Sequence, residues 1–209
     1  MKQIKEFIKL TRVPEWAEQM QGSLFFAIIY LVFSGSSIAE PLVVFFLYQI
    51  CIFTYGFTLN SITDREIDQK VSKKNFSKYF PNWFIYLNTI LWGLGALLLA
   101  SLFGFGVLVI GIVNLALATF YSARPFRLKA RGLVGLASVS LATTVLPFVF
   151  LLGIVNTNLE FGLFLAIAVL IKQLYFELSH QIIDFGNDKK TKVKTWAVRI
   201  GMKKARWVD

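Results

Sequence analysis

Two rows of polar side chains stand where two apolar stretches of the chain end. If each stretch is helical and its helix continues, a spacing of about four residues places the members of a row on one face. Like charges at this spacing repel one another, and ionisable groups near a bilayer are costly and usually functional. A bound divalent cation would relieve both costs. The first row is Asn60, Asp64 and Asp68, and the second is Asp184 and Asp188.

The chemistry of these rows is that of a hard cation. Aspartate and amide oxygens favour Mg2+ over zinc, and Mg2+ is held by one or two carboxylates while phosphate oxygens and water complete its shell. Two facing rows therefore predict two Mg2+ ions bridged by a diphosphate. The alternative is that these acids are solvated loop charges balanced by neighbouring Lys and Arg. Two similarly spaced rows on one side of the predicted bundle favour the metal interpretation.

Polar residues recur every three or four positions along the last apolar run. Such a stripe must face the interior of a bundle or a wet cavity. Glu177 could instead form a structural pair with Lys172, and His180, the single histidine, is interpreted as a cavity-wall residue rather than a metal ligand. The stripe comprises Gln173, Glu177, His180 or Gln181, Asp184 and Asp188.

A basic loop with a Pro turn, residues 120–132, forms a third signal. One interpretation is topological charge in contact with lipid headgroups. The functional interpretation is a clamp on a polyanion, in which Arg127 and Lys129 neutralise a diphosphate and Tyr121 lines the cavity.

The elements that must position these residues are membrane-spanning helices. The 209 residues are 56% hydrophobic and include 21 Phe, well above the roughly 45–50% apolar content of soluble domains. Runs of about 20 apolar residues predict an all-α, polytopic transmembrane bundle forming one domain over residues 1–209. Residues 2–18 predict an interfacial amphipathic helix, or alternatively a charged stop before the first span. The six predicted spans are 22–38, 41–59, 82–103, 104–121, 133–155 and 160–183.

The net charge of +10 could indicate nucleic acid, but the positions of the charges explain it better. Of the 22 Lys and Arg residues, 21 fall in four segments on one side of the predicted bundle. The positive-inside rule makes that side cytoplasmic. The sequence thus predicts a multi-pass cell-membrane protein with no nucleic-acid partner, whose N-terminus and two aspartate rows face the cytoplasm.

With these motifs in order, the chain resembles the UbiA superfamily of intramembrane prenyltransferases. Residues 60–68 and 181–188 resemble its two aspartate motifs, 121–129 its Tyr- and Lys-containing loop, and 8–12 its N-terminal signature ending in Arg12. Since the superfamily usually has nine spans, six predict a C-terminally truncated chain. The departures are Ser61 and Gln181 at aspartate positions, Lys192 at a usual Gly, and Lys74-Asn75 in place of Arg-Pro.

The resemblance implies Mg2+-dependent transfer of a polyprenyl group from an isoprenoid diphosphate to an aromatic or lipid-soluble acceptor in the bilayer. Asp64, Asp68, Asp184 and Asp188 would be catalytic, and with Asn60 they would hold two Mg2+ ions. Alternatives are an inactive or truncated relative that binds isoprenoid diphosphate or scaffolds a partner, and a transporter, which acids at the membrane surface disfavour. The predicted substrate-binding residues are Arg12, Arg65, Tyr121, Arg127, Lys129, Glu177, His180 and Gln181.

Overall fold

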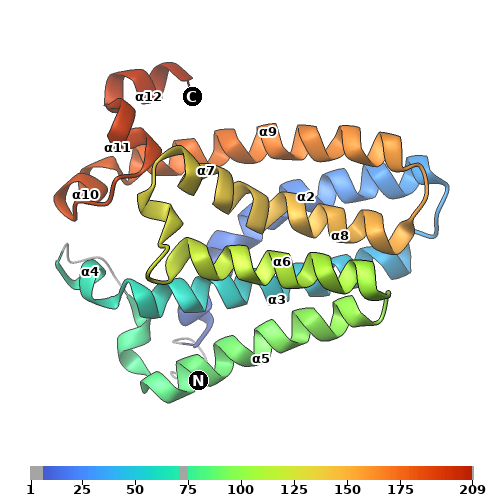
Figure 1. Ribbon diagram of the computed structural model, residues 1–209, viewed down its shortest axis with the longest axis horizontal. Coiled ribbons are helices and arrows are strands. Elements are labelled where there is room, and N and C mark those ends of the chain that lie inside the picture. Colours follow the sequence, from blue (N-terminus) through green and yellow to red (C-terminus); the bar gives the residue numbers. More distant parts are fainter. Residues whose placement is uncertain (1–6, 71–74, 209) are drawn as a thin grey trace.

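Long helices packed side by side form the body of the protein, as the computed structural model shows (Figure 1). It describes residues 7–70 and 75–208. The long elements are α2 (Val13–Ser34), α3 (Ala39–Thr63), α5 (Asn82–Ser101), α6 (Phe105–Ser122), the continuous unit α7 (Leu133–Ser140), η3 (Leu141–Val145) and α8 (Leu146–Val155), and α9 (Leu159–Ile183). The short ones are α4 (Arg65–Lys70), η1 (Phe76–Tyr79), η2 (Leu128–Ala130), α10 (Phe185–Lys190), α11 (Trp196–Ile200) and α12 (Met202–Val208).

Five of these elements are long and apolar enough to cross a membrane, and the chain is a multi-pass membrane protein. They are α3, α5, α6, the α7–α8 unit and α9. Each corresponds to a predicted span, with ends that differ by a few residues. The predicted first span, 22–38, falls on α2, which is not among the five.

The N-terminal elements have other bounds than predicted, since residues 7–10 are helical but residues 13–18 already belong to the next helix. Residues 13–18 belong to α2 rather than to a separate interfacial helix, and α2 ends at Ser34, before the predicted end of the first span. The helix begins where Arg12 takes a left-handed φ of 54° and Pro14 occupies the first turn, a position that suits proline. Trp16 then stacks on Phe53 of α3. Residues 2–6 of the predicted interfacial helix lie outside the described residues.

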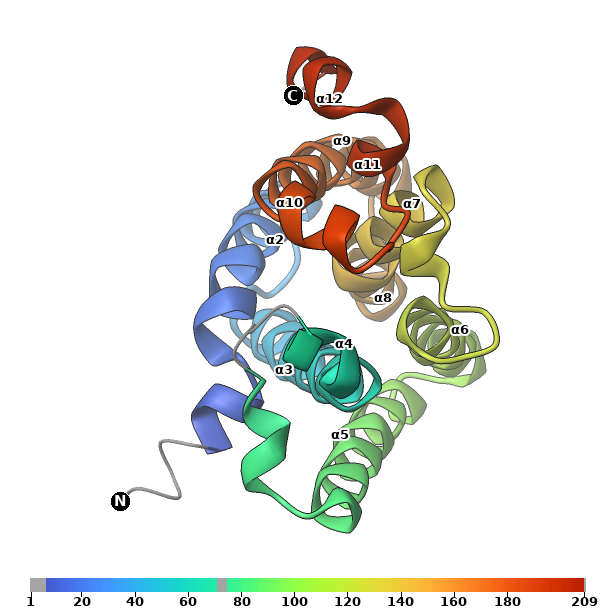
Figure 2. The same cartoon turned by 90° about the vertical axis from the view of Figure 1, so that its left-hand side faces the viewer.

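Helix α3 occupies the centre of the packing. It contacts α2, α5, α6 and α8, and α9 contacts α2, α7 and α8, an arrangement visible along the bundle in Figure 2. Tyr48 of α3 stacks on Phe150 of α8, with ring centroids 3.8 Å apart. Stacked aromatic side chains supply large buried area in the interior of the bundle.

A wider, π-helical turn interrupts the fifth predicted span. Pro147 has no N–H for the carbonyl of Thr143, and its ring crowds that carbonyl, so the helix widens at η3. Asn114 donates to the carbonyl of Ala142 at 2.7 Å and accepts from Tyr48 at 3.1 Å. Asn114 of α6 thus connects α3 and η3 through its side-chain amide.

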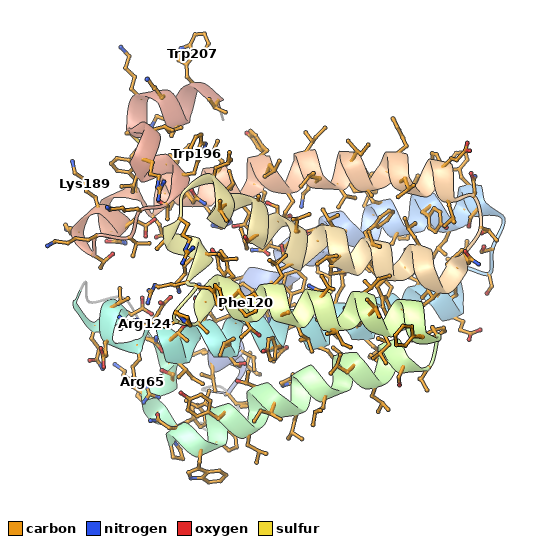
Figure 3. The ribbon with its side chains drawn as sticks, in the orientation of Figure 1. Arg65, Phe120, Arg124, Lys189, Trp196 and Trp207 are labelled. Atoms are coloured by element: carbon orange, nitrogen blue, oxygen red, sulfur yellow. The ribbon has the colours of Figure 1, made fainter. Side chains whose placement is uncertain are left out.

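Both aspartate rows lie at the same end of the bundle. Helices α4 and α10, which contain the last aspartate of each row, emerge at the left of Figure 1, and the tight turns lie at the right. In the turn between α8 and α9, Asn156 and Asn158 both adopt positive φ. Figure 3 shows Arg65, Arg124 and Lys189 at the same end as the rows.

Candidate active site

The local geometry of both rows is as the spacing predicts. The backbone N–H of Asp64 donates to Asn60 O at 3.0 Å, and that of Asp68 donates to Asp64 O at 2.8 Å. Across the second row, the N–H of Asp188 donates to Asp184 O at 3.0 Å. Helical hydrogen bonds therefore continue past the ends of α3 and α9 and keep each row on one face.

One cavity of about 280 Å³ receives both rows, close to the size of small-ligand sites. It also receives side chains from α2, α6, the α6–α7 loop and η3. Of the predicted site residues, it is lined by Asn60, Asp64, Asp68, Asp184, Asp188, Arg12, Tyr121, Arg127, Lys129, Glu177, His180 and Gln181.

Asp64 forms ion pairs with two basic side chains in this cavity. Arg127 Nη2 lies 2.8 Å from Asp64 Oδ1, and Lys129 Nζ lies 2.5 Å from Asp64 Oδ2. The three side chains are largely buried, with exposed fractions of 15%, 15% and 9% for Asp64, Arg127 and Lys129. Such a buried charge is tolerated only because it is paired and hydrogen-bonded.

Asn60 joins the same network. Its Oδ1 accepts from Lys129 Nζ at 2.6 Å and from Ser122 Oγ at 3.1 Å. Burial lowers the pKa of the Lys129 ammonium, and the Asp64 carboxylate opposes that shift. The charge of Lys129 thus depends on its acidic partner.

Asp68 is held by a residue that the sequence interpretation passed over as a departure. Asn75 Nδ2 donates to Asp68 Oδ2 at 2.8 Å and to Ser61 O at 2.9 Å. Asn75 Oδ1 in turn accepts the N–H of Ser77 at 3.0 Å. Ser61 itself is buried, and its hydroxyl donates to Phe57 O, one turn earlier in the same helix, at 2.8 Å.

Replacing Asn75 should make the position of Asp68 less fixed, although Asn75 itself does not line the cavity. If Asp68 supports Mg2+ as the sequence predicts, we expect Asn75→Ala to weaken Mg2+-dependent ligand binding by about 10–100-fold, because losing the hydrogen-bond partner of a metal ligand typically has this effect. Isothermal titration with Mg2+ and a prenyl diphosphate would measure it. Asn82→Ala, which removes a hydrogen bond from the same connection but away from the cavity, is the control. Equal effects of the two substitutions would contradict the role of Asn75.

Arg65 is the predicted substrate-binding residue that the structure places elsewhere. It does not line the cavity. Its guanidinium donates to Ser77 Oγ at 2.9 Å and to Asn82 Oδ1 at 2.6 Å. Although Arg65 directly follows Asp64 in the sequence, its side chain points away from the row and connects α4 to the start of α5.

The second row is tied to the basic loop through the backbone. The N–H of Gly132 donates to Lys194 O at 2.9 Å, and Gly132 forms an isolated bridge with Thr195. Gln181 lines the cavity, and its Oε1 accepts the N–H of Ala197 in α11 at 3.2 Å. The amide at this position therefore holds the start of α11, a contact that neither spacing nor composition indicates.

Lys192 stands at a position whose backbone favours glycine. Its φ is +59°, a left-handed conformation that costs about 1–2 kcal/mol for residues with a Cβ. We expect Lys192→Gly to raise the free energy of unfolding by about 0.5–1 kcal/mol. Lys189→Gly, inside α10, should lower it instead. Thermal unfolding of both variants in one detergent checks the opposite signs, and a decrease for Lys192→Gly would refute the account.

Gly135 allows the loop that carries Lys129 to lie against α7. A Cβ at Gly135 would come within 2.5 Å of Leu128 O and 2.9 Å of Lys129 Cα. We expect Gly135→Ala to cost about 1–3 kcal/mol of stability and to weaken binding of a prenyl diphosphate by displacing Lys129. Thermal unfolding and binding titration measure both effects. Gly106→Ala is the control, since its Cβ meets nothing within 4 Å; similar losses in both variants would contradict the proposed contact.

The donor set fits Mg2+ bound together with a phosphate ligand. Among the described residues, no three His, Cys, Asp or Glu side chains converge closely enough to hold a metal by themselves. Mg2+ does not need such a cage, because it is usually held by one or two carboxylates with water and substrate phosphates. Asn60 and Asp64 on one wall and Asp184 and Asp188 on another offer oxygens of this kind.

Several cavity residues escaped the sequence interpretation. Thr143 lines the cavity from the widened turn η3, and Pro147 inside an apolar run is the sequence signal for that turn. Gln19 comes from the part of α2 between the predicted interfacial helix, 2–18, and the predicted first span, 22–38. Other lining residues that were missed are Glu15, Ser122, Asn187, Thr191 and Thr195.

Comparison with known proteins identifies the family. The sequence profile of the UbiA prenyltransferase family matches residues 23–208. The chain belongs to this family. Among curated proteins, none matches the sequence.

Solved structures of the same fold include a UbiA homolog from Archaeoglobus fulgidus bound to GPP and Mg2+, with a TM-score of 0.74 and 21% identity over 96% of this chain and 71% of that one. The same homolog bound to DMAPP and Mg2+ also gives a TM-score of 0.74, at 20% identity and with the same coverage of both chains. A digeranylgeranylglyceryl phosphate synthase structure has a TM-score of 0.73 and 20% identity over 100% of this chain and 72% of that one.

Proposed function

We propose that this protein is a Mg2+-dependent prenyltransferase that moves a polyprenyl group from an isoprenoid diphosphate to a hydrophobic acceptor within the membrane. The observation that carries the proposal is the convergence of both aspartate rows, Arg127 and Lys129 on one cavity among apolar helices. Family membership supports the reaction class. The similar structures bound to GPP or DMAPP with Mg2+ support the donor class.

Asn60, Asp64, Asp184 and Asp188 would hold two Mg2+ ions, and Asn75 would steady Asp68 beside them. When bound, Mg2+ neutralises negative charge on a leaving diphosphate. Arg127 and Lys129 add fixed positive charge in the same space, where a water-poor site strengthens their effect. Arg12, whose guanidinium pairs with Glu15 at 3.2 Å, lines the cavity from α2.

The aromatic side chains that line the cavity would also contribute to the proposed reaction. Ionisation of an allylic C–O bond creates a carbocation that water would capture, so the site must exclude water. Phe53, Phe57 and Tyr121 line the cavity, and aromatic faces attract cations. These side chains would shield the cation until the acceptor attacks.

The orientation in the membrane follows from the charges. Basic residues gather at the end of the bundle that carries the aspartate rows (Figure 3). By the positive-inside rule, this end and the N-terminus would face the cytoplasm of the cell membrane. The diphosphate donor would then enter from the cytoplasmic side.

Binding and release of diphosphate test the proposal. Protein purified in detergent should bind geranylgeranyl diphosphate with Mg2+ and not with EDTA, and it should release diphosphate when a suitable acceptor is added. Binding without release for every acceptor tried would favour a relative that only binds isoprenoid diphosphate. Equal binding with and without Mg2+ would refute the proposal.

A further inference from the structure

A layer of buried polar side chains lies next to the cavity, on the side away from the aspartate rows. Four helices contribute one side chain each, and all four are at most 1% exposed. None of them lines the cavity, but each stands about one turn from a residue of the same helix that does. This polar layer consists of Ser23 of α2, Gln49 of α3, Asn114 of α6 and Gln173 of α9.

The two glutamines of the polar layer stand in the same relation to the two aspartate rows. Gln49 precedes Asn60 by eleven residues, and Gln173 precedes Asp184 by eleven residues. In a helix this separation is about three turns, or about 16 Å. Each glutamine therefore lies on the face of its own row but deeper in the bundle. The cavity extends from the rows to this layer.

Hydrogen bonds between helices hold the layer in place. Gln49 Nε2 donates to Ser23 Oγ at 2.6 Å, which links α3 to α2. Asn114 Nδ2 donates to the carbonyl of Ala142, a lining residue, at 2.7 Å, which links α6 to η3. Paired polar groups in a low-dielectric interior make a core more rigid. An apolar chain could pass the layer only by breaking these bonds.

Gln173 completes the layer from α9. Its Nε2 donates to Glu177 Oε1 at 2.9 Å and to Thr143 Oγ1 at 3.4 Å, and both partners line the cavity. The side-chain oxygens of Gln49 and Gln173 are buried without a hydrogen-bond partner among the described residues. Because an alkyl chain cannot donate to these oxygens, its entry would not compensate for the bonds that it breaks.

The described part of the bundle is closely packed beyond the layer. Tyr48 and Phe150 stack there, and both are fully buried, as are Phe45 and Phe148. Tyr48 donates to Asn114 Oδ1 at 3.1 Å, so these rings lie directly against the layer. Close-packed interiors contain few voids larger than a water molecule. A chain that reaches the layer therefore ends there.

We infer that the polar layer, through Gln49, limits the length of the prenyl chain that the cavity holds. The inference rests on the proposed function, in which the diphosphate lies at the rows and the chain extends inward past Phe57 and Phe53, which line the cavity. The diphosphate occupies the outer part of a depth of about 16 Å. A geranyl chain fits in the remainder, whereas an extended geranylgeranyl chain is longer, so its end gains no contact inside the cavity.

Donors of three lengths test the inference, namely dimethylallyl, geranyl and geranylgeranyl diphosphate. We expect the affinity of the wild-type protein, measured by isothermal titration with Mg2+, to rise from dimethylallyl to geranyl and no further. Gln49→Ala should shift the ratio of affinities about tenfold in favour of geranylgeranyl over geranyl diphosphate, because the space it opens can bury about two more CH2 groups. Ser23 keeps its bond to the carbonyl of Met20 in this variant.

Gln49→Leu is the matched control, because leucine has nearly the volume of glutamine but no amide. It also loses the bond to Ser23, yet it leaves the space filled, so it should keep the wild-type order of affinities. Equal shifts in the two variants would assign the effect to the lost hydrogen bond and would overturn the inference. A further rise of wild-type affinity from geranyl to geranylgeranyl would overturn it as well.

Ala118→Leu provides a test that does not depend on the folding of the Gln49 variants. Ala118 lines the cavity one turn from Asn114, so a larger side chain there shortens the space from within. It should weaken binding of geranyl diphosphate about tenfold while dimethylallyl diphosphate binds as in wild-type protein. Equal losses for both donors would contradict the proposed end of the cavity.

The same titrations separate this inference from the proposed function. If the wild-type protein binds none of the three donors with Mg2+, the proposed function fails and the inference with it. If all three bind with Mg2+ but Gln49→Ala leaves the ratio of their affinities unchanged, the inference alone fails.

Discussion

Asp64→Asn should reduce prenyl transfer on the order of 10³-fold, the loss expected when a central group for charge stabilisation is removed from a preorganised site. The structure adds a second consequence. Asp64 neutralises both Arg127 and Lys129, which are largely buried, so the substitution leaves two cations without their acidic partner. Breaking a buried pair in this way typically costs about 3–5 kcal/mol of stability.

Single-turnover release of diphosphate and thermal unfolding separate the two effects of Asp64→Asn. The double variant Asp64→Asn with Lys129→Met should recover part of the stability but none of the activity, because one of the two unpaired cations is removed and the carboxylate stays missing. Glu66→Gln removes an exposed carboxylate of the same segment and serves as the control. Wild-type turnover in Asp64→Asn would exclude the two-row site.

Asp184→Asn is expected to reduce turnover to a similar extent, again on the order of 10³-fold. Because the two rows would bind one diphosphate together, the turnover of the double variant Asp64→Asn with Asp184→Asn should be little lower than that of either single variant. The measurement is the rate of diphosphate release at saturating donor, together with the Mg2+ concentration needed for donor binding.

Glu160→Gln, at the other end of α9, is the matched control for Asp184→Asn. It should leave both release rate and Mg2+ requirement at wild-type values. Multiplicative losses in the double variant would show that the rows act independently. That outcome would replace a shared diphosphate site with two separate ones.

Local periodicity in the sequence predicted the faces of the aspartate rows and most of the spanning helices. A spacing of four residues placed Asn60, Asp64 and Asp68 on one face, because helical hydrogen bonds fix the angle between neighbours within a few residues. Apolar runs likewise determined five spanning elements, and the distribution of Lys and Arg placed both rows at the same end of the bundle. The motifs alone were specific enough to indicate the family.

The choice of partners was decided by tertiary structure. Lys129 and Asp64 lie 65 residues apart in sequence, and the local sequence pattern does not predict that they pair. Arg65, which directly follows Asp64, instead donates hydrogen bonds to Ser77 and Asn82. The start of α2 also depended on packing, since Trp16 gains a partner only when Phe53 of α3 is in place.

The lining of the cavity shows the same division. Polar spacing on α9 singled out Glu177 as a cavity residue, but Gln19 and Thr143, which line the same cavity, come from helices with no comparable pattern. Thr143 lies in the turn that is widened before Pro147, and Gln19 lies in a part of α2 that extends further toward the N-terminus than its apolar content indicates. The sequence thus determined which helix faces the cavity, because periodicity is a local property. Only the packing of separate helices decided which side chains meet there, because that depends on contacts between residues far apart in the chain.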